Sequence, residues 1–478
     1  MLKIDFANCL SDRVGEHGLE ASLLDRGGAL AVRASELTER LESTRGTGWE
    51  RWRDLAFDPK RSDHTRGVRE VLEWAGDRFE NVVVLGIGGS ALGNIALQSA
   101  LRPATHNLLS RGSRGGPRVF VVDNVDPVYL GSVLRFVLED DPGLERTLFN
   151  VISKSGETAE TAAQFMLVRD LLIEKRGKDA HADHIVAITD PAKGTMRSIC
   201  DANGYRTLPV PEGVGGRFSV LSPVGLFSAG MAGMDIEGLL DGAAAMDVLC
   251  SKKELGENPA AMLATLLVEL GLGNGVREAK PNHVLMPYAN SLYLMADWFR
   301  QLWAESLGKR FDVGGEEVFA GFTPIKALGT TDQHSQVQLY REGPNDKVIG
   351  LIEVEDFGDG DLSIPSGLGV EALSYLEGRS FAELLNAEKR ATEYALVESE
   401  RPNFTIRFPA VDERRVGQFI ALFEIATAYA GLMLNIDAYD QPAVETGKVA
   451  TFGLMGRPGF DEHRLAVEGT LTATGHIV

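Results

Sequence analysis

From residue 80 onward, short apolar runs alternate with longer amphipathic segments, and this alternation restricts the chain to few fold classes. The runs are NVVVLGI (81–87), RVFVVD (118–123), TLFNVIS (147–153), HIVAITD (184–190) and a weaker YRTLPV (205–210). Segments with helical spacing of apolar residues lie between them, at 91–101, 127–139, 158–175 and 191–203. Buried, Val-rich strands that are each followed by a helix predict an α/β fold, in which a parallel sheet carries helices on both faces.

The same pattern recurs more loosely in the second half of the chain. Strands are expected at 283–289, 346–356 and 403–409, and helices at 258–273, 291–309, 379–396 and 412–434. Residues 10–60 lack strand signals and have helical spacing of apolar residues. We therefore expect a helical N-terminal segment (1–65), a first α/β domain (66–245) and a second α/β domain with a C-terminal helical tail (246–478), with the boundary between the α/β domains near 240–260.

Charge and cysteine usage exclude several classes of function. The net charge of −20 makes nucleic acid and anionic membranes poor partners, so any phosphate site must be made positive locally by loops and helix N-termini. Three scattered cysteines, Cys9, Cys200 and Cys250, show no metal-ligand spacing and suit a reducing cytoplasm. We expect no signal peptide, because the N-terminus lacks a basic run followed by an apolar stretch. No segment approaches ~20 uninterrupted apolar residues, so we expect no membrane span.

The first strand runs into a glycine-rich loop that has three possible interpretations. Gly86, Gly88 and Ala91 fit the G-x-G-x-x-G/A dinucleotide pattern, and Asp123 ends the next strand, although it lies beyond the expected ~20 residues. The loop is equally compatible with a Gly-Ser turn that holds a smaller phosphorylated ligand. A tight strand-to-helix turn without a ligand is the third interpretation.

The loop after strand 147–153 gives a more specific signal. Three hydroxyls and a cation gather at a helix start, where free backbone N–H groups favour an anion. A helix cap alone needs only one hydroxyl. The sequence therefore favours a phosphate site here, with the candidate residues Ser153, Lys154, Ser155 and Thr158.

Four further segments carry residues that could perform chemistry. Arg217 follows Gly215 and Gly216, which would let its guanidinium reach an oxyanion in a cleft; a surface arginine in a flexible loop is the alternative. Gln301 and Glu305 share a helix face, where partial burial near tryptophans would raise the carboxyl pKa and suit a base; an ordinary solvated glutamate is the alternative. His334, Gln441 and Lys448 lie in two later polar segments, TDQHS and DQPAVETGK.

Six of these segments together resemble the glucose-6-phosphate isomerase (phosphoglucose isomerase) family over residues 65–450. They are GIGGSALG, SKSGETAET, EGVGGRFSVLSPVG, ESLGK, TDQHS and DQPAVETGK, in the order found in the family. The resemblance implies two doubly wound parallel-sheet domains of the sugar-isomerase (SIS) type. It also implies interconversion of glucose 6-phosphate and fructose 6-phosphate, with no metal or organic cofactor. The expected assembly is a homodimer.

The resemblance further implies a role for each matching residue. Glu305 is the base that moves a proton between C2 and C1, and Arg217 stabilises the charge that develops on a cis-enediol(ate). His334, contributed by the partner subunit, and Lys448 open the sugar ring by proton transfer at O5 and O1. Substrate positioning falls to Gly89, Ser90, Gly216, Gln301 and Gln441, and phosphate binding to Ser153, Lys154, Ser155 and Thr158.

Two departures from the family pattern lie beside ligand-facing positions. Glu157 stands where the family has a small or hydroxylated residue, and Ala443 stands where it commonly has glycine. They bear on affinity rather than on reaction type. Two other functions fit the sequence less well: a non-catalytic sugar-phosphate sensor would not need Glu305 or His334, and an NAD-dependent oxidoreductase would leave the SKSGET and GGRFS segments unexplained.

Overall fold

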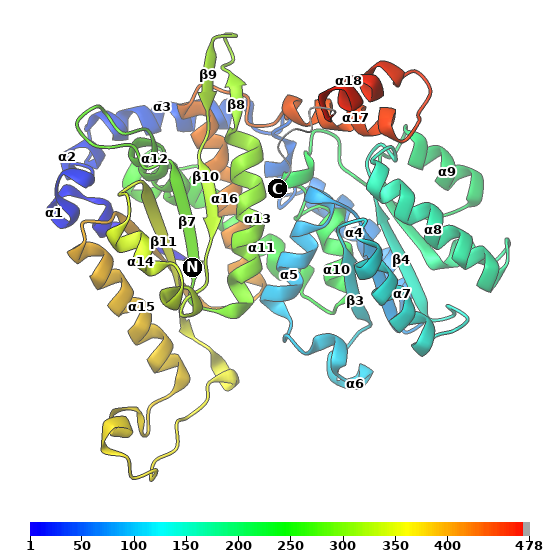
Figure 1. Ribbon diagram of the computed structural model, residues 1–478, viewed down its shortest axis with the longest axis horizontal. Coiled ribbons are helices and arrows are strands. Elements are labelled where there is room, and N and C mark those ends of the chain that lie inside the picture. Colours follow the sequence, from blue (N-terminus) through cyan, green and yellow to red (C-terminus); the bar gives the residue numbers. More distant parts are fainter. Residues whose placement is uncertain (472–478) are drawn as a thin grey trace.

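The computed structural model describes residues 1–471, and two five-stranded sheets with mainly parallel strands organise them (Figure 1). The first sheet has the order β3-β2-β4-β5-β6 and is parallel throughout. Its strands are β2 (Asn81–Leu85), β3 (Arg118–Val122), β4 (Thr147–Ile152), β5 (Ile185–Thr189) and β6 (Arg206–Pro209). The helices that follow these strands are α5 (Leu92–Leu101), α7 (Pro127–Asp140), α8 (Ala159–Arg176), α9 (Thr195–Asn203) and α10 (Pro223–Met231). The strands and helices expected in this half are confirmed, with small shifts at their ends.

Alternate residues of the first sheet enter two different hydrophobic cores. Val82 and Val84 of β2 belong to one core, whereas Val83 and Leu85 belong to the other. This follows from the two-residue period of a strand, because both faces of the sheet are covered by helices. The continuous apolar run in the sequence is therefore the signature of burial on both sides.

The second sheet has the order β1-β12-β11-β7-β10. Its members are β7 (Asn282–Pro287), β11 (Lys347–Asp356), β12 (Asn403–Ala410), β10 (Thr323–Lys326) and β1 (Lys3–Asp5). The main helices around it are α12 (Pro259–Leu272), α13 (Tyr293–Leu307), α15 (Phe381–Glu398) and α16 (Glu413–Met433). The strands β7, β11 and β12 were expected from the sequence, and the helices agree with the expected segments.

The N-terminal segment is not entirely helical as expected. It contains α1 (Ser11–Val14), α2 (Ala21–Leu24), α3 (Ala29–Thr44) and the start of α4 (Lys60–Ala75), but its first residues form β1. This strand pairs antiparallel with β12, with Lys3 opposite Arg407. Three residues carry too little pattern to reveal a strand whose partner is about 400 residues away.

Several helices begin where the side chain of the N-cap residue satisfies free backbone N–H groups. The Asp126 side chain accepts from the Val128 and Tyr129 amides, and the Ser222 hydroxyl accepts from the Val224 amide. In α7, α10 and α12 the first helical residue is proline, which has no N–H to leave unpaired. Helix α15 begins with a capping box of Ser380 and Glu383. These local signals fix where the helices start.

The core is continuous between the two sheets, because α11 (Ile236–Cys250) packs along α16. The boundary expected after residue 245 falls inside α11. Helix α16 is long and apolar enough to cross a membrane by length and composition, but 94% of the relevant window is buried inside the fold. It is therefore a core helix of the second half.

Two peripheral segments leave the body of the molecule (Figure 1). Residues 357–380 form an extended arm that projects beyond α15. After α16, the chain crosses to the first half, where α17 (Glu445–Leu454) and α18 (Asp461–Leu471) lie close to α8 and α9. This crossing brings the C-terminal part of the chain near the carboxyl ends of the first sheet's strands.

Candidate active site

Arg217 is the centre of the candidate site. It lies in a 3₁₀ turn, Gly216–Phe218, and only 2% of its side chain is exposed. Its Nη1 donates to Glu305 Oε1 at 3.1 Å and to Gln441 Oε1 at 2.9 Å. Its Nη2 donates to the carbonyls of Ala438 (2.6 Å) and Asp440 (3.1 Å). Burial lowers the pKa of Arg217, an effect opposed by the carboxylates of Glu305 and Asp440.

Glu305 lies near the end of α13, and its carboxylate is held on both oxygens. Oε1 accepts from Arg217, and Oε2 accepts from Gln301 Nε2 at 3.0 Å, one helical turn earlier. The side chain is 29% exposed, so it is partly buried, as expected from the sequence. A carboxylate offers about four lone-pair positions, so two contacts leave capacity for a substrate.

Two residues that sequence reasoning assigned no role complete this cluster. Ser306 Oγ accepts from Arg217 Nε at 2.7 Å. Lys309 is buried, donates to the carbonyls of Glu305 and Ser306 at 2.8 Å, and lies 3.6 Å from Asp440. Burial and the neighbouring Arg217 cation lower the pKa of Lys309. Both residues belong to the ESLGK segment, so their closeness to Glu305 in sequence was the available signal.

The backbones of two glycine loops touch beside this cluster. A Cβ on Gly89 would lie 2.1 Å from the Gly216 carbonyl carbon, which only glycine avoids. A Cβ on Gly88, whose φ is +57°, would lie 3.1 Å from Gln301 Nε2. Ser90 ends the same turn, and its carbonyl accepts from Asn94. The structure thus brings Gly89, Ser90 and Gly216 to the edge of the Arg217 cluster.

The predicted phosphate loop lies at the carboxyl end of β4. Ser153 Oγ accepts from the Gly156 amide at 3.0 Å, and Ser155 Oγ accepts from the Glu157 amide at 3.2 Å. Thr158 is the N-cap of α8, but its side chain makes no capping hydrogen bond. The first N–H groups of α8 therefore remain available to an anion.

The Lys154 side chain packs against Trp49. Its Nζ lies 4.9 Å from the centre of the Trp49 ring, a contact that the sequence did not indicate. Burial lowers the pKa of Lys154, with a smaller opposing effect of Asp190. The Lys154 carbonyl accepts from the Asp190 amide at 3.2 Å, so this residue also joins the loop to the end of β5.

His334 and Lys448 are not joined to the Arg217 cluster by any hydrogen bond within residues 1–471. His334 lies in the 3₁₀ turn Thr331–His334 and is exposed. Lys448 lies on α17, is 52% exposed and forms an ion pair with Glu445 at 2.6 Å. Their predicted catalytic roles remain predictions.

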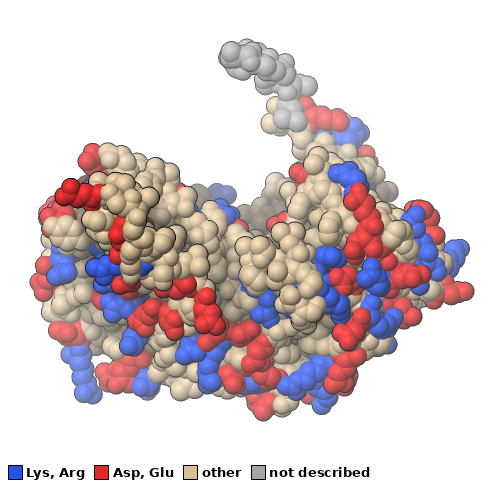
Figure 2. Space-filling view, turned by 90° about the horizontal axis from the view of Figure 1, so that it is seen from below, with Lys and Arg blue, Asp and Glu red and all other residues tan. Residues whose placement is uncertain are grey.

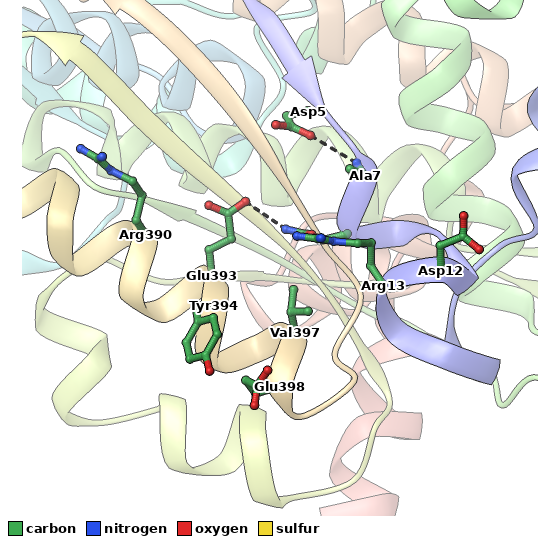
Figure 3. Close-up of a pocket in the computed structure, with 10 residues that line it drawn as sticks. Asp5, Ala7, Asp12, Arg13, Arg390, Glu393, Tyr394, Val397 and Glu398 are labelled. Carbon is green, nitrogen blue, oxygen red and sulfur yellow. Dashed lines mark hydrogen bonds between the residues drawn. The ribbon is translucent and has the colours of Figure 1, made fainter.

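Several surface hollows among residues 1–471 lie away from this site. Among residues 1–471, no three His, Cys, Asp or Glu side chains gather as a metal site would require. A polar hollow of about 490 Å³ lies between the N-terminal segment and α15 (Figure 3). It is lined by Asp5, Ala7, Asn8, Asp12, Arg13, Arg390, Glu393, Tyr394, Val397 and Glu398, none of which is a predicted site residue. Acidic and basic side chains are interspersed on the face shown in Figure 2, so positive charge there comes from individual residues.

The chain is similar to known proteins over most of its length. The family model described as phosphoglucose isomerase matches residues 65–458. A glucose-6-phosphate isomerase of Carboxydothermus hydrogenoformans is 46% identical over 400 residues, covering 84% of this chain and 83% of the relative. One of Rubrobacter xylanophilus is 42% identical over 438 residues, covering 91% and 96%. The crystal structure of a glucose-6-phosphate isomerase from Chlamydia trachomatis superimposes with a TM-score of 0.77 at 25% identity, covering 98% of this chain and 95% of that one.

Proposed function

The chain belongs to the phosphoglucose isomerase family, and from this membership we infer that it interconverts glucose 6-phosphate and fructose 6-phosphate. The observation that carries the assignment of its site is the double contact of Arg217 Nη1 with Glu305 and Gln441. These three residues come from segments spread over more than 200 positions. Each of them lies in a segment that resembles the family.

Glu305 is the base of the proposed reaction. Its carboxylate removes the proton from C2 of open-chain glucose 6-phosphate, and the electron pair of that bond forms the C1–C2 double bond of a cis-enediol(ate). The former carbonyl pair of C1 is left on O1, which takes up the proton of O2. The same carboxylic acid then returns its proton to C1, and a lone pair of O2 forms the C2 carbonyl of fructose 6-phosphate. A proton on carbon is weakly acidic, so the base must be close and the developing charge must be stabilised.

Arg217 supplies that stabilisation. It is charged at working pH and is held in place by a serine hydroxyl, a glutamine and two main-chain carbonyls. A buried cation that is already oriented need not reorganise when negative charge appears on the substrate oxygens. Gln301 and Gln441 complete the positioning of the reacting carbons.

The phosphate binds at the start of α8, where the hydroxyls of Ser153, Ser155 and Thr158 meet unpaired N–H groups. Binding energy at this distant group orients the reacting carbons.

Lys448 and a His334 from the partner subunit of a homodimer open the ring. The side chain of His334 is exposed and has no hydrogen-bond partner within residues 1–471. It is therefore free to enter the active site of a second copy of the chain. We also propose a cytoplasmic location, which suits three free, buried cysteines.

The assay supplies fructose 6-phosphate to the purified protein with a chelator and without NAD. Samples are quenched, and glucose 6-phosphate is then measured with a separate dehydrogenase. We expect steady formation of glucose 6-phosphate. If none forms, the isomerase assignment is wrong; if it forms only with added NAD, the oxidoreductase alternative is favoured.

Glu305→Gln tests the identity of the base. The amide keeps the size of the side chain but cannot accept the C2 proton, so we expect binding of fructose 6-phosphate by calorimetry without turnover or solvent exchange at C2. Exposed Glu139→Gln is the matched control and is expected to behave like the unmodified protein. A Glu305→Gln variant with full activity means that another group is the base.

A further inference from the structure

A carboxylate lies inside the loop that the phosphate must enter. Glu157 stands between Ser155 and Thr158, and a free carboxylate there would repel a phosphate dianion. In the structure both of its oxygens are engaged: Oε1 accepts from Thr195 Oγ1 at 3.1 Å, and Oε2 lies 3.4 Å from Arg457 Nη2. The negative charge of Glu157 is therefore matched by a cation from the far end of the chain.

Arg457 is held in position for this contact by its neighbours. It lies in the turn between α17 and α18, a region close to α8 and α9 (Figure 1). Its guanidinium carbon lies 4.5 Å from the centre of the Phe452 ring and 5.4 Å from that of Phe460. The two rings pack edge to face at 5.3 Å, and the Arg457 amide donates to the Phe452 carbonyl at 2.9 Å. Cation–π contacts with both rings reduce the freedom of a side chain that would otherwise be mobile.

The cation inside the loop itself, Lys154, is poorly placed to do the same. Lys154 lies over Trp49, and its electrostatic neighbours include the carboxylates of Asp190 and Glu212. Its charge is therefore shared with acids other than Glu157. Since the whole chain carries a net charge of −20, an unmatched Glu157 would add to a field that already opposes a phosphate.

We propose that Arg457 determines affinity for the phosphate group of the substrate by neutralising Glu157, so that the 153–158 loop accepts a dianion. The residue acts through Glu157 and takes no part in proton transfer. The inference rests on the proposed function, because it takes the loop to be the phosphate site. It assigns the C-terminal helical hairpin, α17 and α18, a role in substrate affinity.

The test compares Arg457→Gln, Glu157→Gln and the double variant with a control, Arg464→Gln. Arg464 lies on α18 and pairs with Glu468 at 3.2 Å, so the control removes one charge from the same hairpin without touching the loop. Each protein is assayed for KM and kcat with fructose 6-phosphate, for inhibition by inorganic phosphate, and for its unfolding temperature.

We expect Arg457→Gln to raise KM and the inhibition constant of phosphate about five- to tenfold, as one unmatched charge near a partly exposed anion would. The kcat should stay within about twofold, because no reacting group is altered. Glu157→Gln should lower KM, and the double variant should return to within about twofold of the original value, because removing the carboxylate removes the need for Arg457. The increase in KM caused by Arg457→Gln should shrink at ~1 M salt, because the Debye length there is only ~3 Å and charges are strongly screened.

Several results would overturn the proposal. One is a KM for Arg457→Gln equal to that of Arg464→Gln; another is a double variant as weak as Arg457→Gln alone. A fall in kcat and in unfolding temperature at unchanged KM would show that the ion pair only holds the hairpin in place. If the original protein has no isomerase activity, the proposed function fails separately, and calorimetric binding of inorganic phosphate to the four variants still decides the role of Arg457.

Discussion

Glu424 lies in the middle of α16 with 2% of its surface exposed, and its Oε1 has no hydrogen-bond partner. Burial raises the pKa of this carboxyl well above its ordinary value of 4.5. The folded chain therefore holds a proton on Glu424 that the unfolded chain releases once the pH exceeds about 4.5. Because the folded state then binds more protons, a rise in pH favours unfolding. This group thus makes the fold less stable as the pH rises above that value.

Glu424→Gln removes the proton equilibrium while keeping the size of the side chain. The free energy of unfolding of the variant, relative to the original, should rise by about 1.4 kcal/mol for each pH unit in which Glu424 stays protonated only in the fold. At pH values near or below 4.5 the two proteins should differ little. The free energy of unfolding of Glu424→Met should exceed that of Glu424→Gln by about 1 to 3 kcal/mol at every pH, because methionine also removes an unpaired buried polar group.

The measurement is chemical unfolding at pH 5, 6, 7 and 8 for both variants and for the exposed control Glu139→Gln. We expect the curves of free energy against pH to diverge for Glu424→Gln and to coincide for the control. Parallel curves for Glu424→Gln and the original would refute the reasoning, because they would show that Glu424 is ionised, and hence solvated or paired, inside the folded protein.

Three further predictions concern the active site. Lysine at position 217 cannot reproduce the five contacts of the Arg217 guanidinium. The kcat of Arg217→Lys should therefore fall about 100-fold or more while the circular dichroism spectrum is unchanged. A loss of kcat below tenfold would contradict the role in charge stabilisation. Gly89→Ala places a methyl group 2.1 Å from the Gly216 backbone, so activity should be lost with a lowered unfolding temperature, and a variant indistinguishable in both would show that the loops separate at little cost. Inactive Glu305→Gln and His334→Ala proteins can be mixed under conditions that exchange subunits. If each site of a two-fold dimer uses His334 of the partner subunit, half of the dimers are mixed and each has one complete site, so roughly one quarter of full activity should return. No recovery would place both residues of a site in one chain.

Much of the fold could be predicted because its strands are buried on both faces. Such strands read as continuous apolar runs, so β2 to β5 were recognisable from their composition alone. The strands that were missed are short or polar: β1 has three residues, β10 has four including Pro324, and β8 (Lys309–Phe311) and β9 (Glu317–Ala320) form an exposed hairpin. Their existence depends on partners far along the chain, which local pattern does not contain.

The site divides in a similar way between local and distant information. The loops around Gly89, Ser153 and Arg217 could be predicted because each pairs a strand end with glycines or hydroxyls in one short segment. The carbonyls of Ala438 and Asp440 that hold Arg217 could not, since main-chain acceptors have no residue signature. The same applies to Arg457, whose importance is visible only once the C-terminal hairpin lies beside Glu157.

The pairing of β1 with β12 also sets an order of events during synthesis. Residues 3–5 leave the ribosome early, but their partners, residues 405–407, follow about 400 positions later. At ordinary rates of translation that interval lasts roughly 20 to 80 s. The first sheet spans residues 81–209 and can form within this time, whereas β1 must wait unpaired. A ribosome that stalls before residue 403 would therefore leave a chain with one finished sheet and a free strand at its N-terminal end, available to other edges.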